Sequence, residues 1–357
     1  MSVFIIAEAG VNHNGNLETA CRLVDAAVAA GADAVKFQTF KAENLVTRHA
    51  DKAAYQKTAT AADENQLTML KRLELKYELH FQLSAYCQER GIEFLSTAFD
   101  FESLDFLVRE LGVARLKIPS GEITNGPFLL AHAQTGKPII LSTGMATLGE
   151  VETALAVLAF GYLAPTRTQQ PSISAFQQAY RSAPGQSVLQ DKVSLLHCTS
   201  EYPTPMENIN LKAMDVLQQA FGLKAGYSDH SVGLVAPIAA AARGAAVIEK
   251  HFTLDKSQQG PDHKVSLEPD ELKTMVCSIR DVEKALGQKL KCPQDLELEN
   301  QKVVRKSLVA KHPIASGECF SETNLTMKRP GTGKSPMDYW ALLGKPSHRH
   351  YDADECI

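Results

Sequence analysis

Two histidines with polar neighbours are the side chains best placed for chemistry in this chain. His230 and His251 stand where two apolar runs end, in the strings GYSDHSVG and VIEKHF. In a strand, residues two apart share a face, so Ser228 points with His230 and Glu249 points with His251. One histidine at a strand end is usually a structural polar residue. Two at neighbouring ends, with parallel strands about 5 Å apart, favour a divalent metal site.

Polar or ionisable side chains also end the other apolar runs. They include Glu8, Lys36, Gln38, Thr97, Lys117, Ser120, Glu122, Ser142, Thr143, His197, Thr199 and Tyr202. Lysines beside hydroxyl groups supply the charge and the directional donors that a phosphate or carboxylate needs, although a structural ion pair is the alternative for either lysine. The turns KIPSGE and STGM add backbone N–H groups and small residues that let an anion approach. The residues alone therefore predict a metal-dependent enzyme for a small phosphorylated or carboxylated substrate.

Eight β-rich runs alternate with helical runs and must position these side chains. Strands are expected at 3–8, 34–40, 93–97, 115–119, 138–143, 193–199, 224–228 and 246–252, and helices at 17–30, 64–90, 102–111, 127–134, 150–159, 211–221, 235–243 and 269–286. Strict alternation indicates parallel strands with right-handed crossovers. Eight units fit a closed (β/α)8 TIM barrel better than an open sheet, and a barrel gathers functional groups at the carboxyl ends of its strands.

Three stretches differ from this alternation. Residues 161–190 lack clear periodicity and are expected to form a surface insertion with a short helix near 174–180. Residues 288–303 are polar and charged and are interpreted as a linker after a catalytic domain of residues 1–287. Residues 304–357 combine short β-runs with Gly and Pro turns, which predicts a small, mostly β domain. A domain of that size has a thin core and gains stability by docking on a larger one.

Composition excludes several classes of protein. A hydrophobic content of 44% and a net charge of −4 are ordinary for a globular chain and give no electrostatic reason to expect nucleic acid or a membrane as partner. No run is long enough to span a bilayer, and no signal peptide is expected at the start. The seven cysteines show no CxxC spacing, so a reducing cytoplasm is expected.

Eight strings resemble the N-acetylneuraminate (sialic acid) synthase family. They are IAEAGVNHNG, AVKFQTFKAENL, LKIPSGEITN, IILSTGMATLGE, LLHCTSEYPTP, GYSDHSVG, VIEKHFTLD and GPDHKVSLEPDEL. The tail strings SLVAKHPIASGECF and NLTMKRPGTG resemble the antifreeze-like, or SAF, domain of that family. The resemblance covers nearly the whole chain, apart from 161–190 and the last few residues.

The resemblance implies a transferase that condenses phosphoenolpyruvate with an N-acetylated mannosamine-type sugar. The methylene carbon of phosphoenolpyruvate attacks the open-chain aldehyde, water adds to the resulting cation, and phosphate leaves by C–O cleavage. N-acetylmannosamine, giving N-acetylneuraminate, is the first expectation for the sugar. The alternative is 2,4-diacetamido-2,4,6-trideoxymannose, giving N,N'-diacetyllegionaminate, and a pseudaminate synthase is less favoured.

The same resemblance assigns roles to residues that match its motifs. It implies His230 and His251 as ligands of a divalent metal, with Mn²⁺ expected and Mg²⁺ or Co²⁺ as alternatives. It implies phosphoenolpyruvate contacts at Lys36, Gln38, Thr97, Lys117, Ser120, Ser142, Ser200 and Ser228, where Ser200 replaces a family asparagine. It implies sugar contacts at Tyr202, Asp262 and Arg329. Glu122 and Glu8 are the candidate proton shuttles, and Glu122 is favoured.

The family's SAF domain reaches over the barrel of a partner subunit, which implies a domain-swapped homodimer with Arg329 in the partner's active site. The alternative for Arg329 is a turn-capping role beside Pro330. Two further classes remain open for the whole protein: an aldolase that forms a Schiff base through Lys117 or Lys36, and a non-catalytic binding protein built on the barrel.

Overall fold

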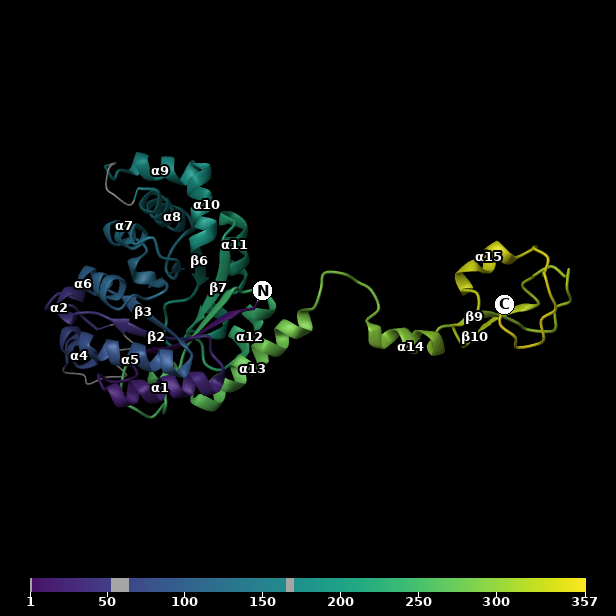
Figure 1. The fold of residues 1–357 in the computed structure, drawn as a ribbon, viewed down its shortest axis with the longest axis horizontal. Helices are drawn as coiled ribbons and strands as arrows, with labels where there is room; N and C mark the ends of the chain where they lie inside the picture. The colour runs from purple at the N-terminus through teal and green to yellow at the C-terminus, as the bar shows by residue number, and fades with distance from the viewer. Residues whose placement is uncertain (1, 53–63, 165–169) are drawn as a thin grey trace. The chain divides into compact units, whose positions relative to one another are not determined.

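Eight parallel strands form a closed barrel in the computed structural model, which describes residues 2–52, 64–164 and 170–357 (Figure 1). The strands pair in chain order, and β8 returns to pair with β1. They are β1 (Phe4–Gly10), β2 (Ala34–Thr39), β3 (Glu93–Ala98), β4 (Leu116–Ile118), β5 (Ile139–Ser142), β6 (Val193–His197), β7 (Lys224–Asp229) and β8 (Val247–His251). The predicted (β/α)8 barrel is confirmed, and each predicted strand overlaps an observed one.

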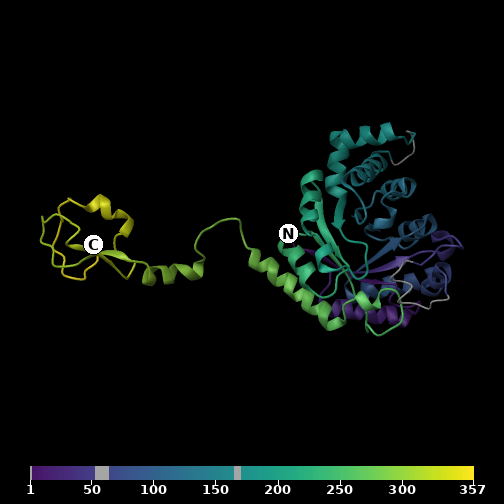
Figure 2. The same cartoon turned by 180° about the vertical axis from the view of Figure 1, so that it is seen from behind.

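Helices form the outer layer of the barrel (Figure 1). They are α1 (Leu17–Ala30), α2 (Ala42–Leu45), α4 (Gln66–Leu73), α5 (Tyr77–Arg90), α6 (Phe101–Asp105), α7 (Gly126–Gln134), α8 (Leu148–Leu163), α9 (Ile173–Arg181), α10 (Ala183–Lys192), α11 (Lys212–Phe221), α12 (Val235–Ala242) and α13 (Pro269–Leu286). A π-helical turn (Phe106–Glu110) follows α6, and 3-10 turns lie at Ser120–Glu122, Met206–Asn208 and His263–Val265. Helix α13 packs against both α1 and α12, as the reverse view also shows (Figure 2).

The two-residue period of the strands divides the barrel interior into layers. An apolar layer is formed by the buried side chains of Ile6, Ala34, Leu95, Ile140, Leu196 and Val247. Two residues further along five of these strands stand the buried polar side chains of Glu8, Lys36, Thr97, Ser142 and Glu249. Because residues two apart share a face of a strand, these polar groups lie inside the barrel, nearer the carboxyl ends of the strands. Alternation along the strands thus places an ionisable layer directly above an apolar one.

One predicted helix is wrong in its extent. Residues 64–90 form two helices, because Glu74 and Lys76 adopt extended backbone conformations between α4 and α5. The carboxylate of Glu74 accepts a hydrogen bond of 3.0 Å from the backbone N–H of Ala42 at the start of α2. Glu74 therefore ties α4 to the segment after β2, a tertiary contact that helical periodicity does not reveal.

The expected insertion is more helical than predicted. Helix α8 continues to Leu163, and α9 and α10 occupy most of the stretch that follows, with residues 165–169 outside the described residues. The hydroxyl group of Ser182, which stands between α9 and α10, accepts a hydrogen bond of 3.0 Å from Gly185 N and caps α10. A Cβ added at Gly185 would lie 1.9 Å from the carbonyl oxygen of Ala179, so this tight connection between the helices requires glycine.

The chain divides into two compact units, Met1–Gly287 and Gln288–Ile357. The smaller unit begins with α14 (Asp295–Val304), a helix with no buried residue, in the stretch that was interpreted as a plain linker. It continues with the antiparallel pair β9 (Ser307–Ala310) and β10 (Leu325–Lys328), a 3-10 turn (Pro336–Asp338) and α15 (Tyr339–Leu342). Its small core contains Ala310, Ile314, Phe320 and Leu325. Within the described residues of the two units, no helix has the length and apolar character needed to cross a membrane.

Candidate active site

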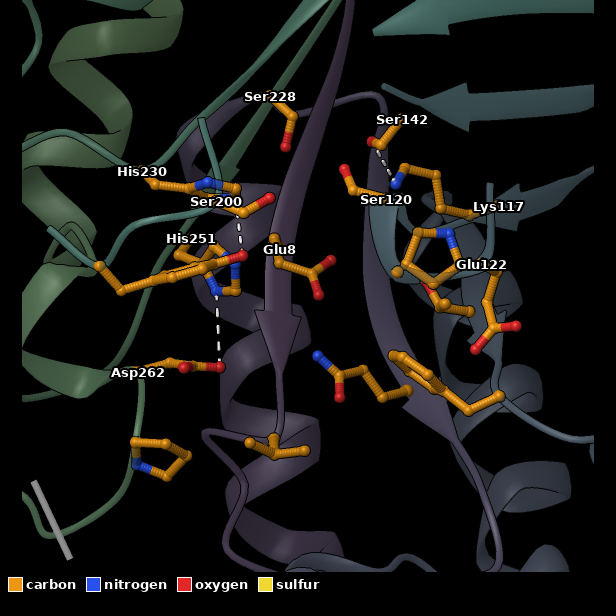
Figure 3. Close-up of a pocket in the computed structure, with 18 of the residues that line it drawn as sticks. Glu8, Lys117, Ser120, Glu122, Ser142, Ser200, Ser228, His230, His251 and Asp262 are labelled. Atoms are coloured by element: carbon orange, nitrogen blue, oxygen red, sulfur yellow. Dashed lines mark hydrogen bonds and ion pairs between the residues drawn. The ribbon is translucent and has the colours of Figure 1, made fainter. Parts of the chain in front are cut away.

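A cavity of about 410 Å³ lies among the carboxyl ends of the barrel strands (Figure 3). Its size falls within the range of about 300 to 1,000 Å³ found for small-molecule sites. All of the residues predicted for the site except Arg329 line it: Glu8, Lys36, Gln38, Thr97, Lys117, Ser120, Glu122, Ser142, Ser200, Tyr202, Ser228, His230, His251 and Asp262. Side chains from distant parts of the sequence therefore converge on one space.

Four buried charged side chains meet in this cavity. Lys36 Nζ lies 2.6 Å from Glu8 Oε2 and 3.6 Å from Glu249 Oε2. Lys117 Nζ lies 3.7 Å from Glu249 Oε1 and donates a hydrogen bond of 2.7 Å to Ser142 Oγ. Both lysines thus have carboxylate neighbours and also line the cavity, so the structural role and the ligand-binding role are compatible.

Burial and ion pairing shift the pKa values of two carboxyl groups, those of Glu8 and Glu249, in opposite directions. Burial raises the pKa of Glu8 even though the ammonium group of Lys36 opposes the shift. Burial acts in the same sense on Glu249, but the ammonium groups of Lys117 and Lys36 outweigh it and hold the pKa of Glu249 below its ordinary value. When Glu8 is protonated, two lysines face one carboxylate, and this imbalance favours an anionic ligand.

A tight cradle of small side chains adjoins Lys117. Ser120 Oγ accepts a hydrogen bond of 2.9 Å from Gly144 N and lies 3.1 Å from Cys198 Sγ. A Cβ added at Gly144 would lie 2.5 Å from Ser200 Oγ and 2.8 Å from Ser120 Oγ. Glycine at this position therefore lets the segments after β4, β5 and β6 approach one another. Hydroxyl groups and backbone N–H groups beside an ammonium group are the donors that bind phosphate or carboxylate.

The two predicted metal ligands lie side by side, with ring centroids 5.7 Å apart. His230 Nδ1 lies 2.6 Å from the carbonyl oxygen of Thr199, which can only accept, so Nδ1 carries the proton and Nε2 carries the lone pair. The hydroxyl group of Tyr202 lies 3.0 Å from that Nε2 and donates to it. His251 Nδ1 is buried and has no hydrogen-bond partner among the residues that the structure describes, and it lies 3.9 Å from Asp262 Oδ2 (Figure 3).

These imidazoles fit the requirements of a divalent metal ion. Burial lowers the pKa of both His230 and His251, so both rings are neutral at neutral pH, which is the form that binds metal. The carbonyl oxygen of Thr199, which accepts from His230 Nδ1, fixes the tautomer of His230. Hydrogen bonds of this kind orient metal-binding histidines in known metal sites. Across the described parts of the chain, no three or more His, Cys, Asp or Glu side chains are grouped to hold an ion. Water or substrate would therefore supply the remaining ligands.

The residues predicted for the sugar lie around the same cavity. Glu122 stands at the end of the 3-10 turn after β4, half-buried, and accepts a hydrogen bond of 2.7 Å from Asn125 Nδ2. Asp262 is buried, and burial raises its pKa to about 6 against the opposing charge of Lys36. Arg329 belongs to the smaller unit, directly after β10, where its side chain is exposed.

Several strand-end residues bond to the backbone and do not line the cavity. His197 Nε2 bonds to the carbonyl oxygen of Ile209 at 2.7 Å, and Thr143 Oγ1 donates to that of Leu196 at 3.0 Å. Residue type and strand position do not predict this difference, because a polar side chain at the end of a strand can point into the cavity or toward neighbouring backbone groups.

Sequence reasoning also missed three features of the site. The cavity-lining thiol of Cys198 and the carbonyl oxygen that orients His230 carry no sequence signal. The third is an apolar wall of the cavity formed by Val11, Leu45, Val46, Met69, Leu70, Leu73 and Phe99. Apart from Val46, these residues belong to a small hydrophobic cluster separate from the barrel core. In sequence Met69, Leu70 and Leu73 look like ordinary core positions of the helix predicted at 64–90, and the other apolar residues of the wall carry no signal of a binding site.

Comparison with known families gives two matches. Residues 23–291 match the model of the NeuB family, and residues 305–357 match the model of the SAF domain. Together these matches cover β2 to β8 of the barrel and most of the smaller unit, while β1 lies before the first match.

Individual proteins are similar over nearly the whole chain. The N,N'-diacetyllegionaminic acid synthase of Campylobacter jejuni subsp. jejuni serotype O:2 is 50% identical over 99% of this chain and 98% of its own. The enzyme of the same name from Legionella pneumophila is 47% identical over 96% of this chain and 90% of its own. The crystal structure of N-acetylneuraminic acid (sialic acid) synthetase from Leptospira borgpetersenii, in complex with citrate, is 34% identical, with a TM-score of 0.66, over 84% of this chain and 90% of that one.

Proposed function

The chain belongs to the NeuB family, and on that premise we propose that it is an N,N'-diacetyllegionaminate synthase. The reaction would join phosphoenolpyruvate, 2,4-diacetamido-2,4,6-trideoxymannose and water to give N,N'-diacetyllegionaminate and inorganic phosphate. The observation that carries this choice of sugar is similarity: two legionaminic acid synthases are 50% and 47% identical to the chain, and a sialic acid synthetase is 34% identical. The second of the two sugars considered from the sequence is therefore favoured.

Phosphoenolpyruvate would occupy the part of the cavity around Lys36 and Lys117. The excess of ammonium groups there offsets its negative charge, and the hydroxyl groups of Ser120, Ser142 and Ser200 provide directional donors. Because a Cβ at Gly144 would clash with Ser120 Oγ and Ser200 Oγ, glycine there lets these two hydroxyl groups converge on one side of the cavity, where they can donate to a phosphate. This part of the site would fix the methylene carbon of phosphoenolpyruvate relative to the sugar.

In the proposed reaction a carbon–carbon bond forms between that methylene carbon and the aldehyde carbon of the open-chain sugar. The aldehyde oxygen takes up a proton, water adds to the cation left on the phosphoenolpyruvate carbon, and phosphate departs with the cleaved C–O bond. Burial that raises the pKa of Glu8 supports Glu8 as the proton donor. The sequence alone favoured Glu122, which we place at the sugar.

We propose that His230 and His251 hold a divalent ion, with Mn²⁺ expected and Mg²⁺ or Co²⁺ as alternatives. Such an ion, when bound, supplies polarisation of the aldehyde carbonyl. The chain's own contribution is to keep both imidazoles neutral and to hold His230 in one tautomer through the carbonyl oxygen of Thr199. The hydroxyl group of Tyr202 would then be released from His230 Nε2 and could bind the sugar.

We also propose a homodimer in which Arg329 contacts the sugar bound by the partner subunit. Helix α14 supports this proposal because it has no buried residue and exposes Leu296 and Val303, which are 89% and 66% exposed. Apolar side chains that exposed on a helix gain stability from an interface. All seven cysteines are free thiols, which supports a cytoplasmic location.

The test is phosphate release by the purified protein with phosphoenolpyruvate, Mn²⁺ and each candidate sugar. The proposal predicts the highest kcat/KM with 2,4-diacetamido-2,4,6-trideoxymannose and a product that carries both acetamido groups. A higher kcat/KM with N-acetylmannosamine would favour a sialic acid synthase, and no phosphate release with either sugar would refute a synthase of this kind.

One observation keeps a Schiff-base aldolase as a second candidate. Burial lowers the pKa of Lys117, which favours the neutral amine that attacks a carbonyl. Treatment with pyruvate and borohydride would trap Lys117 covalently in an aldolase. In the proposed synthase, the mass of the protein should remain unchanged by that treatment.

A further inference from the structure

The catalytic cavity has one apolar side that the proposed chemistry does not use. Leu45, Leu70 and Phe99 line the cavity and are only partly buried in the hydrophobic cluster beneath them. Met69 and Leu73 are buried members of the same cluster and complete the wall. Within the described part of α4, Gln66 is the one polar side chain that reaches the cavity. The wall therefore offers a ligand mainly apolar contacts.

The barrel's strand order places Leu45, Leu70 and Phe99 across from His230 and Tyr202. Leu45 and Leu70 follow β2, and Phe99 follows β3. In a closed barrel of eight strands paired in chain order, strands four places apart face each other, so these residues stand opposite the segments after β6 and β7. Those segments carry Tyr202 and His230. A sugar whose aldehyde lies at the imidazoles would direct its other end toward the apolar wall.

The wall is fixed in place by contacts that do not involve a ligand. The carboxylate of Glu74, at the end of α4, accepts a hydrogen bond of 3.0 Å from Ala42 N in α2. Lys71 and Glu43 pair at 2.6 Å between the same two helices. Because these contacts join α2 directly to α4, the spacing of Leu45 and Leu70 is set before a substrate enters, as is usual for a binding pocket.

From this placement we infer that the part of the apolar wall formed by Leu45, Leu70 and Phe99 is the subsite for the deoxygenated C6 end of the sugar. The inference rests on the proposed function and assigns the preference for a 6-deoxy sugar to named residues. A C6 methyl group buries apolar surface against these side chains. A C6 hydroxyl group in the same position loses water and finds no partner on Leu45, Leu70 or Phe99, and that loss disfavours it.

The sharpest probe differs from N-acetylmannosamine by one oxygen atom. It is 2-acetamido-2,6-dideoxymannose, which has a methyl group at C6 and a hydroxyl group at C4. With phosphoenolpyruvate and Mn²⁺ saturating, we expect the wild-type kcat/KM for this sugar to exceed that for N-acetylmannosamine by about 10- to 100-fold, the range over which apolar pockets discriminate against an added hydroxyl group. A wild-type ratio near one would overturn the assignment.

Leu70→Gln tests the wall directly, because glutamine keeps helix propensity and places polar atoms in the subsite. We expect this substitution to reduce the ratio of the two kcat/KM values by about tenfold or more, with the KM for phosphoenolpyruvate unchanged. Leu67→Gln is the matched control, because Leu67 belongs to the same cluster and the same helix but does not line the cavity. Leu45→Asn provides a second variant if Leu70→Gln does not fold.

The results separate this inference from the proposed function. A ratio that falls in Leu70→Gln or Leu45→Asn but not in Leu67→Gln would support the subsite. An equal change in all three variants, or none, would refute the subsite even if 2,4-diacetamido-2,4,6-trideoxymannose still drives phosphate release. If none of the three sugars releases phosphate with wild-type protein, the proposed function fails, and the subsite assignment fails with it.

Discussion

Lys250 Nζ lies 2.6 Å from Asp229 Oδ2, and neither side chain has any exposed surface. Asp229 precedes His230 at the end of β7, and Lys250 precedes His251 at the end of β8. The ammonium group also donates to the carbonyl oxygen of Ser231, so it contacts the residues on both sides of His230. The ion pair therefore joins the two strand ends that carry the predicted metal ligands.

Removing one member of this pair should destabilise the barrel strongly. Lys250→Met leaves the Asp229 carboxylate buried without its cation, which costs about 3 to 5 kcal/mol in comparable cases. Urea unfolding monitored by circular dichroism would measure the loss in free energy of unfolding. The double variant Asp229→Asn/Lys250→Met removes both charges and should recover part of that loss. A single variant as stable as wild type would show that the pair does not hold the strands together.

The predicted metal ligands can be tested without measuring turnover. His251→Ala removes one of the two imidazoles, and we expect the affinity for Mn²⁺, measured by titration calorimetry, to fall by more than about 100-fold, beyond the range produced by outer-shell changes. His197→Gln is the control, since His197 ends β6 and bonds to the backbone without lining the cavity. Equal Mn²⁺ affinity in His251→Ala and wild type would remove His251 from the metal site.

The ionisable layer of the site could be predicted from sequence because strand alternation is strict. Once the apolar runs are aligned as strands, Glu8, Lys36 and Glu249 must share the face that carries Ile6, Ala34 and Val247 two residues earlier. The pairing of Ser228 with Glu249, at 2.8 Å, follows from the same rule applied to neighbouring strands. These positions depend only on local periodicity and on the order of strands in a barrel.

Features that depend on a tertiary contact could not be predicted in the same way. The break at Glu74 exists because its carboxylate bonds to Ala42 N, and residues 64–90 otherwise keep a helical pattern. Leu70 resembles any core leucine of α4, yet it lines the cavity. The tautomer of His230 depends on a backbone carbonyl, and every residue has one. Sequence identifies which residues carry chemistry better than it identifies what orients them.

The position of Arg329 can be tested by subunit complementation. Arg329→Ala and His251→Ala should each be inactive as homodimers. If Arg329 acts on the partner's sugar, a mixed dimer contains one barrel with intact histidines and an arginine from its neighbour, so random mixing of a two-fold dimer should restore about a quarter of wild-type activity. Coexpression of the two variants provides the mixed dimers, and phosphate release measures them. No restored activity would place Arg329 in its own subunit's site, and an active Arg329→Ala homodimer would place it outside the site.

A buried histidine far from the cavity should make stability depend on pH. His132 on α7 is fully buried, and burial lowers its pKa from 6.5 to about 4. Below pH 6.5 His132 is protonated in the unfolded chain but stays neutral in the folded chain, so the free energy of unfolding falls as the pH falls. From pH 6.5 to pH 5 the loss is about 1.6 kcal/mol. His132→Leu should remove this part of the pH dependence, as urea titrations at the two pH values would measure.

The exposed His49 provides the control for that experiment. His49→Gln should show the same difference in stability between the two pH values as wild type. If His132→Leu also keeps the full wild-type dependence, His132 is not protonated selectively in the unfolded chain, and the assignment is wrong.

The cradle around Gly144 leads to a prediction that separates phosphoenolpyruvate binding from sugar binding. In Gly144→Ala the new methyl group would lie 2.5 Å from Ser200 Oγ and 2.8 Å from Ser120 Oγ, so these hydroxyl groups must leave the positions from which we propose that they donate to the phosphate. Losing one or two directed hydrogen bonds to a charged ligand should raise the KM for phosphoenolpyruvate by about tenfold or more, with a much smaller effect on the KM for the sugar. Gly149→Ala is the matched control, because a Cβ there meets no atom within 4 Å. Steady-state kinetics with each substrate varied in turn would separate the two effects. A larger rise in the sugar KM would place the cradle at the sugar and move the proposed phosphate site elsewhere in the cavity.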